Sequence, residues 1–362
     1  MKAIHQFVAG YSRGDAISNE AVVMRDIFRS WGYASEICSE TRRILPELRK
    51  DALDVEAIRT TIQPDDVVLL HLSIGSNVND VFASLPCRKA ILYHNITPSE
   101  YLRGVQEEVA MNLAKGREQA KRLTAVATVN LADSAYNARE FEQMGCASVG
   151  VLPLILNFDA LRKGSDRRQY ALFDDGKTNI LFVGRCVPNK RIEDILYAFH
   201  YFQRYVDSNS RLILAGSYNG MESYQAYQLT VQKELKLRDV VFTGSIPQQS
   251  LNACYRVADL FLCMSEHEGF CIPVLEAMAL DLPVLAHAAA AVPDTMDGAG
   301  VLFHQKEYDA VAEMMGRLCR ETTLREAVID GQRQRIERYE SRNLEQELRQ
   351  QLAPLLDDVK KQ

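Results

Sequence analysis

The sequence predicts an α/β protein built from two domains, each with a parallel β-sheet covered by helices on both faces. Three observations lead to this prediction. Strand-like apolar runs alternate with helical segments along the whole chain. A polar, charged segment from Arg162 to Lys177 separates two such series and is the expected linker. The 362 residues, 47% of them hydrophobic and 25% charged, are enough for two hydrophobic cores.

Each series is predicted to contain five strands, with helices between them. In the first series the strands are expected at residues 3–8, 66–72, 90–93, 125–129 and 148–152. In the second series they are expected at residues 179–183, 211–215, 240–243, 260–263 and 283–286. Residues 318–356 are predicted to be helical.

Charge, cysteine content and hydrophobic pattern argue against some classes of protein. The net charge of -6 argues against a nucleic-acid-binding protein, which normally carries a strong basic patch. The eight cysteines form no Cys-x-x-Cys pair and no zinc-ligand spacing with histidine, so we expect small buried hydrophobes and no metal. The first residues form a strand-like run without a secretory signal, and no apolar stretch is long enough to span a bilayer. We therefore expect a cytoplasmic protein.

The segment from Ser265 to Ala279 carries the strongest functional signal. It places two carboxylates, Glu268 and Glu276, on either side of a glycine turn and a helix start marked by Pro273. Free amides at a helix start, with Gly269 allowing close approach, suit a phosphate-bearing ligand. Glu276 is placed to bind ribose hydroxyls, and Glu268 a second hydroxylated group. The alternative is that Glu276 only complements the helix dipole and Glu268 is a solvated loop acid.

This segment closely resembles the Glu-x7-Glu signature of retaining glycosyltransferases of family 4. Further matches follow the family's order along nearly the whole chain. They are the diphosphate-binding strand and turn at residues 183–190, the next strand at 214–217, the base-cradling turn at 242–246 and the loop at 291–295.

The resemblance implies the GT-B architecture, in which two Rossmann-like, doubly wound domains face each other across a cleft. Residues 1–160 would then form an acceptor-binding domain, joined by a C-terminal helix at 340–362 that crosses back to it. Residues 161–339 would form the domain that binds the nucleotide sugar. The crossing is expected near Tyr339 to Asn343.

For the second domain, the resemblance implies a donor site without a metal ion. Arg185 and Lys190 would stabilise the charge that builds on the leaving diphosphate, although a solvated surface Arg and Lys is the alternative. Glu268 is the expected catalytic residue that grips donor-sugar hydroxyls. The remaining diphosphate-binding residues are predicted to be Gly269, Phe270 and Cys271, with Gly14 contributed by the loop after the first strand of the first domain. The nucleotide-binding residues are predicted to be Ser217, Ile246 and Glu276.

For the first domain, His94 resembles the family's active-site histidine, acting through its backbone or its ring. The alternative is a histidine satisfied by hydrogen bonds at a strand end. Asp15, His71 and Ser134 are predicted on the acceptor side, with Asn137 near them. A helix cap is the commoner role for Asp15, and a structural role is at least as expected for His71.

The implied reaction is hexose transfer from a nucleotide diphosphate sugar with retention of configuration, without cofactor, metal ion or protein nucleophile. GDP-mannose is the favoured donor, with a UDP-sugar as alternative. The acceptor would be a saccharide or lipid-linked saccharide in surface-polysaccharide (O-antigen, capsule or exopolysaccharide) synthesis. A catalytically silent nucleotide-sugar-binding scaffold, and epimerases or phosphorylases of the same architecture, are the other possibilities. Basic residues at 42, 43, 49 and 50 and in 113–123 suggest peripheral contact with the inner face of the membrane, or a solvated helix face.

Overall fold

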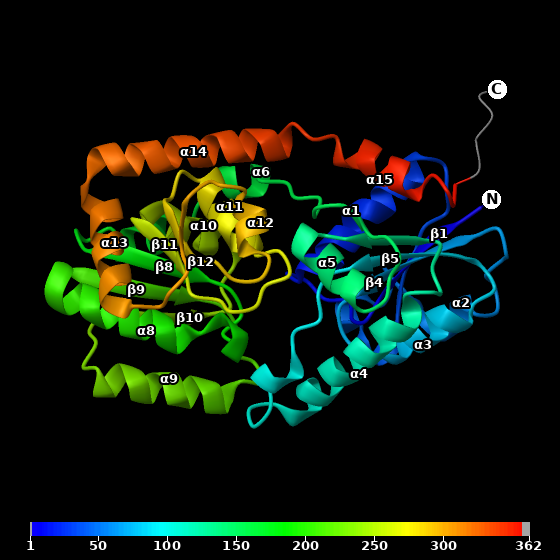
Figure 1. Cartoon of the computed structure of the whole chain (residues 1–362), viewed down its shortest axis with the longest axis horizontal. Helices are drawn as coiled ribbons and strands as arrows, with labels where there is room; N and C mark the ends of the chain where they lie inside the picture. Colours follow the sequence, from blue (N-terminus) through cyan, green and yellow to red (C-terminus); the bar gives the residue numbers. More distant parts are fainter. Residues whose placement is uncertain (1, 357–362) are drawn as a thin grey trace. The chain divides into compact units, whose positions relative to one another are not determined.

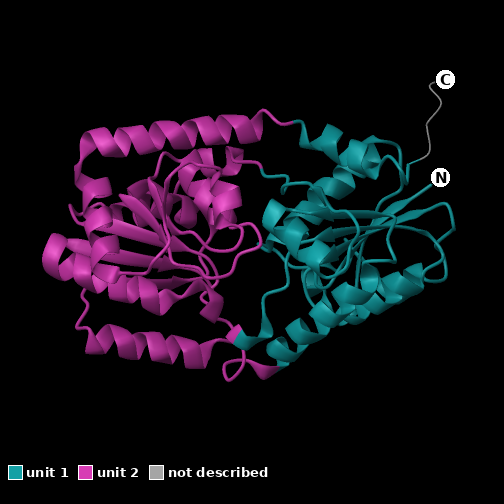
Figure 2. Cartoon of the chain, viewed as in Figure 1, with its two compact units in different colours: residues 1–100, 108–156, 343–362 teal, residues 101–107, 157–342 magenta. Residues whose placement is uncertain are grey.

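The computed structural model describes residues 2–356. The chain divides into two compact units, shown in different colours in Figure 2. Unit 1 consists of Met1–Glu100, Glu108–Leu156 and Asn343–Gln362, and unit 2 of Tyr101–Glu107 and Asn157–Arg342. Each unit is built around its own parallel sheet, so each is described by itself.

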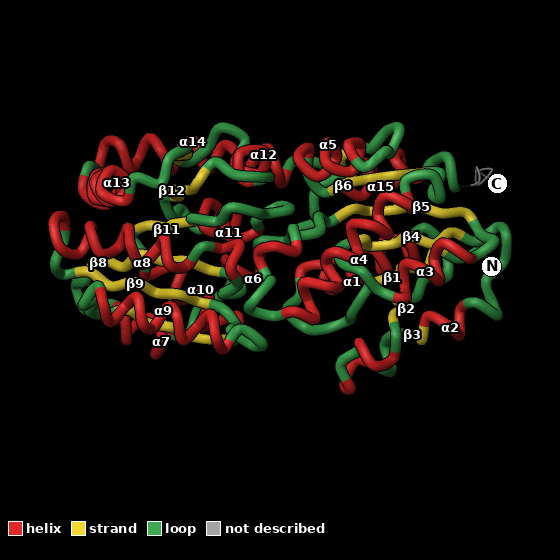
Figure 3. The backbone as a smooth tube through the Cα atoms, turned by 60° about the horizontal axis from the view of Figure 1, so that its bottom comes forward, coloured by secondary structure: helices red, strands yellow, loops and turns green. Residues whose placement is uncertain are grey.

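Unit 1 contains a seven-stranded parallel sheet in the order β3-β2-β1-β4-β5-β6-β7 (Figure 3). Its strands are β1 (Ile4–Val8), β2 (Ile37–Ser39), β3 (Leu53–Asp54), β4 (Val67–Leu72), β5 (Arg88–Tyr93), β6 (Val129–Ala132) and β7 (Gly150–Val151). Its helices are α1 (Ala16–Ser30), α2 (Val55–Ile58), α3 (Asn77–Ser84), α4 (Glu107–Leu123), α5 (Ala135–Gln143) and α15 (Leu344–Leu352).

The last helix of the chain completes the core of unit 1. Leu348 and Leu352 of α15, with Leu355 after it, are buried against Ile4 of β1 and Leu92 of β5. Apolar side chains at this spacing form one stripe along a helix, which is removed from water when it packs on the sheet. The prediction that a C-terminal helix returns to the first domain is confirmed for Leu344–Leu352, and residues 357–362 of the predicted helix lie outside the described residues.

Unit 2 contains a six-stranded parallel sheet in the order β10-β9-β8-β11-β12-β13. Its strands are β8 (Thr178–Val183), β9 (Ser210–Ala215), β10 (Val240–Gly244), β11 (Leu260–Cys263), β12 (Val284–His287) and β13 (Val301–Phe303). Its helices are α6 (Asp159–Arg162), α7 (Arg167–Phe173), α8 (Ile192–Tyr201), α9 (Glu222–Glu234), α10 (Gln248–Val257), α11 (Ile272–Ala279), α12 (Val292–Met296), α13 (Tyr308–Arg320) and α14 (Thr322–Glu340). Figure 1 labels all of these except α7, which is labelled in Figure 3.

Both sheets follow the doubly wound Rossmann order, and this order positions the candidate site. The chain reverses its direction of winding between β1 and β4 in unit 1 and between β8 and β11 in unit 2. In open α/β sheets, ligands bind beyond the carboxyl ends of the strands at such a switch point. The loops that follow these four strands are therefore the loops of interest.

The structure differs from the sequence prediction in the shorter strands. β2, β3 and β13 were not predicted, because strands of two or three residues are too short to show a hydrophobic pattern. The predicted strand at 125–129 is wrong in position, since residues 124–128 connect α4 to β6, which begins at Val129. The ladder with β5 aligns Ala90 with Val129 and so fixes this later start. The strand predicted at 148–152 is reduced to the two residues of β7.

The predicted linker and the predicted C-terminal helix also need correction. Much of the segment from Arg162 to Lys177 folds as helix α7, whose capping residue Asp166 bonds the hydroxyl of Ser250 at 3.1 Å. The helical run from 318 to 356 is broken at Glu321 and again between Ser341 and Asn343. Among the described residues, no helix combines the length and the apolar character needed to cross a bilayer.

A pair of glycines seats the loop after β4 against helix α4. The Gly75 amide donates to the Asn112 carbonyl oxygen at 3.0 Å. A Cβ atom at Gly116 would lie 2.4 Å from the Gly75 nitrogen, and one at Gly75 would lie 2.4 Å from the Asn112 oxygen. The two backbones can approach this closely only because neither residue has a side chain.

This contact predicts opposite effects for two Gly→Ala substitutions within helices. Gly116→Ala should lower the free energy of unfolding by about 1–3 kcal/mol, because the new methyl group would strike rigid backbone. Gly331→Ala in α14 meets nothing within 4 Å and should stabilise by about 0.5–1 kcal/mol through helix propensity. Thermal and urea denaturation would measure both, and equal stabilisation of the two variants would contradict the close packing.

Candidate functional site

The centre of the candidate site in unit 2 is an ion pair between Lys190 and Glu268. Lys190 ends a short turn after β8, and Glu268 lies on the loop after β11, so the pair joins the two strands at the switch point. The Lys190 ammonium group donates to Glu268 Oε2, and the two side chains are only 19% and 8% exposed. Burial lowers the pKa of Lys190, but the charge of Glu268 outweighs this and the pKa is raised. The Lys190 ammonium group is therefore held in its charged form.

Backbone contacts fix the two loops that carry this pair. The Asn189 side-chain amide donates to the His267 carbonyl oxygen at 2.9 Å, and the Glu266 amide donates to the Asn189 carbonyl oxygen at 2.9 Å. The Ala291 amide donates to the Glu268 carbonyl oxygen at 3.2 Å. The motifs at 183–190, 265–279 and 291–295, which are far apart in sequence, thus meet in one place.

The turn between Glu268 and α11 is tightly constrained. The Thr295 hydroxyl donates to the Phe270 carbonyl oxygen. Cys271 caps α11 with φ at 69°, a left-handed conformation that is strained for a residue other than glycine. The helix begins at Ile272, so Pro273 is its second residue rather than its first. Gly269 lies between Glu268 and Phe270, which are both predicted to bind the donor, and it is partly exposed.

The predicted nucleotide-binding residues lie on neighbouring loops of the same unit. Glu276, in α11, accepts a hydrogen bond of 2.7 Å from the Tyr255 hydroxyl, and burial raises the pKa of its carboxyl group. Ser217 and Ile246 are partly exposed in the loops after β9 and β10. Arg185 is exposed after β8 and forms no ion pair with any residue in the described range 2–356. Lys190 and Glu268 are thus brought together, whereas Arg185 is not joined to them.

Two cysteines share the surroundings of Glu268. The ligand atoms of Cys263, Glu268 and Cys271 lie within 4.8 Å of one another, and all three residues are buried. A hydrogen bond from Cys271 lowers the pKa of Cys263 and raises that of Cys271. These are the residues of unit 2 that could hold a soft metal ion, but Lys190 already neutralises the carboxylate among them.

In unit 1, two predicted acceptor residues are helix caps. Asp15 accepts hydrogen bonds from the Ser18 amide at 2.9 Å and hydroxyl at 2.8 Å and so caps α1. Ser134 accepts from the Asn137 amide at 3.1 Å and caps α5. The capping interpretation of Asp15 is confirmed. Gly14, next to Asp15, is exposed with φ at 74° and leaves the turn open to solvent.

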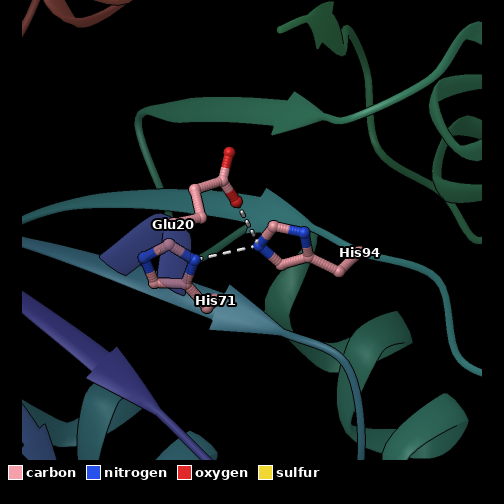
Figure 4. Close-up of side chains that lie close together, drawn as sticks. All are labelled: Glu20, His71 and His94. Atoms are coloured by element: carbon pink, nitrogen blue, oxygen red, sulfur yellow. Dashed lines mark hydrogen bonds and ion pairs between the residues drawn. The ribbon is translucent and has the colours of Figure 1, made fainter. Parts of the chain in front are cut away.

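His94 and His71 form the polar centre of unit 1 (Figure 4). His71 Nδ1 lies 2.9 Å from His94 Nε2, and His71 Nε2 lies 3.0 Å from Gln6 Oε1. His94 Nδ1 lies 3.2 Å from Asp133 Oδ2, and its Nε2 lies 3.6 Å from Glu20 Oε2. Both ring nitrogens of each histidine are thus used inside unit 1, which favours the structural interpretation of His71.

The histidine pair is buried, and its two rings differ in charge preference. Burial lowers the pKa of His94, but the hydrogen bond to Asp133 and the charge of Glu20 outweigh it, so that the pKa is raised. Burial and the charge of His94 together place the pKa of His71 well below its usual value. Burial also raises the pKa of Glu20 to about 7.

Sequence reasoning missed three members of this cluster, namely Gln6, Glu20 and Asp133. Each had a weak signal. Gln6 is a polar residue inside an apolar strand, Glu20 lies on the buried face of α1, and Asp133 directly follows β6. Single polar residues in such places are also common without function, so the contacts were needed to identify them.

Comparison with known proteins gives consistent results. Residues 165–335 match the family model described as "Glycosyl transferases group 1". An Escherichia coli protein called O-antigen chain mannosyltransferase B is 30% identical over 132 residues, 36% of this chain and 34% of that protein. A Mycolicibacterium smegmatis GDP-mannose-dependent alpha-mannosyltransferase is 32% identical over 120 residues, 33% of this chain and 28% of that protein. These matches span about a third of either relative.

The fold is shared over nearly the whole chain. The crystal structure of Anabaena Alr3699/HepE in complex with UDP and glucose has a TM-score of 0.75 at 16% identity, covering 98% of this chain and 100% of that one. At this identity the likeness shows the fold alone, which is GT-B as expected. The motif order and the family match identify residues 165–335 of unit 2 as a glycosyl transferases group 1 domain, and the chain as a whole shares the GT-B fold.

Proposed function

We propose that this protein is a retaining glycosyltransferase that moves a hexose from a nucleotide diphosphate sugar to a saccharide or lipid-linked saccharide. The observation that carries the proposal is the buried Lys190–Glu268 pair at the switch point of unit 2, within a glycosyl transferases group 1 domain. A fixed cation and a fixed carboxylate side by side suit the two ends of a sugar diphosphate. Lys190 would attract the phosphates, and Glu268 would accept hydrogen bonds from sugar hydroxyls.

The proposed chemistry needs no nucleophile from the protein. The bond between the anomeric carbon and the β-phosphate oxygen breaks, and the acceptor oxygen forms a new bond on the same face of the sugar. The departing phosphate oxygen takes the acceptor proton, so the charge balances. The protein positions the partners and stabilises the negative charge on the diphosphate, with Lys190 and the exposed Arg185 as the expected cations. No cofactor or metal ion is part of this proposal.

In unit 1, we propose that His94 acts through its backbone rather than through its ring. Its side chain is only 2% exposed, and both ring nitrogens are engaged by His71 and Asp133. The next residue, Asn95, has φ at 75° and is anchored by a 2.8 Å hydrogen bond to Asn137. A loop held this firmly presents its backbone in one conformation, as preorganised binding requires.

GDP-mannose is the proposed donor, and surface-polysaccharide synthesis the proposed setting. Two of the sequence relatives are named as a mannosyltransferase of O-antigen chains and a GDP-mannose-dependent mannosyltransferase. Exposed basic residues at 42, 43, 49 and 50 support a peripheral contact between unit 1 and an anionic membrane that carries a lipid-linked acceptor.

A catalytically silent scaffold that binds nucleotide sugars is the second candidate. The Lys190–Glu268 pair would hold a nucleotide sugar in either case, so activity rather than geometry separates the two candidates. Incubation with a panel of sugar nucleotides separates the two, since only an enzyme hydrolyses or transfers the sugar.

Glu268→Gln should reduce turnover roughly 10²-fold or more, because the amide keeps the shape but loses the charge that grips the sugar. Glu266→Gln is the matched control on the same loop, since Glu266 pairs with Arg191 and Lys306 rather than with Lys190. Initial rates of donor hydrolysis and of transfer to simple glycosides would be compared. Near-normal turnover by Glu268→Gln would refute the assigned role.

Lys190→Ala should weaken GDP binding about 10- to 100-fold, because a charge-assisted contact to the diphosphate is lost. Isothermal calorimetry would measure the affinity, with Lys233→Ala on the exposed face of α9 as control. Because Lys190→Ala leaves Glu268 buried without its partner, the double variant Lys190→Met, Glu268→Gln should restore the melting temperature but not the affinity. Unchanged affinity in both variants would contradict a diphosphate site here.

GDP should raise the melting temperature more than UDP at equal concentration, because a ligand that binds only the folded protein stabilises it by an amount that grows with the logarithm of its affinity. At about 100 times the Kd the expected gain is roughly 2.7 kcal/mol. Thermal shift assays with GDP, UDP and ADP would rank the bases. A larger shift with UDP would replace GDP-mannose by a UDP-sugar as the proposed donor.

A further inference from the structure

Four side chains form a hydrogen-bonded row across unit 1. Gln6 lies in β1, His71 in β4, His94 directly after β5 and Asp133 directly after β6, and these four strands are neighbours in the sheet. Gln6 is paired with Leu69, so His71 lies two residues further along β4 than the partner of Gln6. In the same way, His71 is paired with Leu92, so His94 lies two residues beyond the partner of His71. Residues two apart point to the same face of a sheet, which is why the row can form.

The two ends of the row can only accept hydrogen bonds. The Gln6 amide nitrogen donates to the Ala21 carbonyl oxygen at 2.8 Å, which turns Gln6 Oε1 towards His71. Asp133 Oδ1 accepts from the Asn137 side-chain amide at 2.5 Å, and its Oδ2 faces His94 Nδ1. His71 must therefore carry a proton on Nε2, and His94 must carry one on Nδ1.

The nitrogens that remain, His71 Nδ1 and His94 Nε2, face each other at 2.9 Å. Two neutral rings would then point lone pairs at each other, which is repulsive. One extra proton between them converts the repulsion into an N–H···N hydrogen bond and makes one ring an imidazolium. The Asp133 carboxylate lies 3.2 Å from His94, and the Glu20 carboxyl group lies 3.6 Å from the same ring, so His94 is the ring that carries the charge.

The geometry of the pair fits a proton better than a metal ion. Glu20, His71 and His94 offer three ligand atoms within 4.8 Å of one another, as a metal site would. The ring planes are only 5° apart and the centroids 5.1 Å apart, so the two nitrogens lie almost on the line between the centroids (Figure 4). A metal ion on that line would need nitrogens about 4 Å apart, since each Zn–N bond is about 2.0 Å. A separation of 2.9 Å suits a shared proton.

We propose that Gln6 and His71 are positioning residues that hold His94 as a buried imidazolium, and that this charge locks the loop from His94 to Ile96. The role in transfer rests on the proposed function, whereas the protonation of His94 does not. Gln6 fixes the tautomer of His71, and His71 then offers His94 an acceptor. The groups that face His94 are Asp15 and Glu20 of the α1 region, His71 of β4 and Asp133 after β6.

The charge supports a loop that is otherwise strained. Asn95 has a positive φ of 75°, and the Ile96 amide donates to the Tyr93 hydroxyl at 3.1 Å. An anchored imidazolium at the first residue of this loop resists its relaxation into solvent, because removing the charge from its carboxylates would cost more than the strain relieved. Loss of the proton should therefore loosen the loop without unfolding the sheet.

The direct test is a ¹⁵N NMR titration of histidine-labelled protein between pH 5.5 and 8.5. His94 should show two protonated ring nitrogens at pH 6.5 and should keep them to a higher pH than an unperturbed histidine, whereas His71 should stay neutral with its proton on Nε2. The chain has seven histidines, and the spectra of position-71 and position-94 variants assign the signals. A neutral His94 at pH 6.5 in the unmodified protein would overturn the proposal, and this measurement needs no variant to fold.

Three substitutions test the positioning role. His71→Asn places an amide oxygen near the site of Nδ1 and should keep His94 charged, whereas His71→Leu removes the acceptor and should lower the midpoint of the His94 titration by more than one pH unit. Gln6→Leu frees His71 to place its proton on Nδ1 and should also make His94 neutral. Melting curves verify that each variant is folded. An unchanged titration midpoint in both His71→Leu and Gln6→Leu would overturn the role of the row.

Activity gives the second, separable readout. With a raised pKa, the imidazolium is present at low pH and is lost as the pH rises through that pKa, so kcat/KM should fall on the alkaline side. His71→Leu should shift this fall to lower pH, and His71→Asn should restore it. An alkaline limb that His71→Leu leaves in place would overturn the role in transfer. Absence of any turnover, with the NMR result as expected, would count against the proposed function alone.

Discussion

Charges buried at the carboxyl ends of parallel strands must be paired inside the protein, and both candidate sites depend on this constraint. In unit 2 the pair is Lys190 with Glu268, and in unit 1 it is His94 with Asp133. Removing one partner of a buried pair costs about 3–5 kcal/mol, because the other charge remains without solvent. Each pair therefore ties together loops that follow different strands, and it fixes their backbones before any ligand arrives.

Much of the fold could be predicted because its central strands are buried on both faces. β4, β8 and β9 are nearly continuous apolar runs, and such runs mark parallel strands covered by helices on each side. The short strands β2, β3 and β13 are set by pairing to their neighbours, which leaves no periodic signal. The break between α14 and α15 is likewise a tertiary effect, since α14 belongs to unit 2 whereas Leu348 and Leu352 of α15 lie in the core of unit 1.

The candidate site was predictable where its residues lie close together in sequence and only partly where the fold assembles them. Glu268, Gly269 and Glu276 lie within nine residues on one loop and helix start, so their spacing, together with the family signature that it resembles, indicates a donor site. The partnership of Lys190 with Glu268 joins loops 78 residues apart in sequence. Gln6 and Asp133 are far apart in the sequence, and only the strand order reveals that one row of hydrogen bonds connects them.

The charge of the histidine cluster also explains the behaviour of Glu20. His94 and Asp133 already cancel as an imidazolium and a carboxylate, so an ionised Glu20 would leave a net negative charge in a buried place. Burial accordingly raises the pKa of Glu20 to about 7, far above its ordinary value. A carboxyl group whose pKa is raised by folding contributes stability at low pH and loses that contribution as the pH rises through the folded value. The pKa of His94 is also raised, so its contribution to stability is likewise lost as the pH rises. Glu20 and His94 thus favour a protonated unit 1, and the cluster is least strained on the acidic side of neutrality, where its charges cancel.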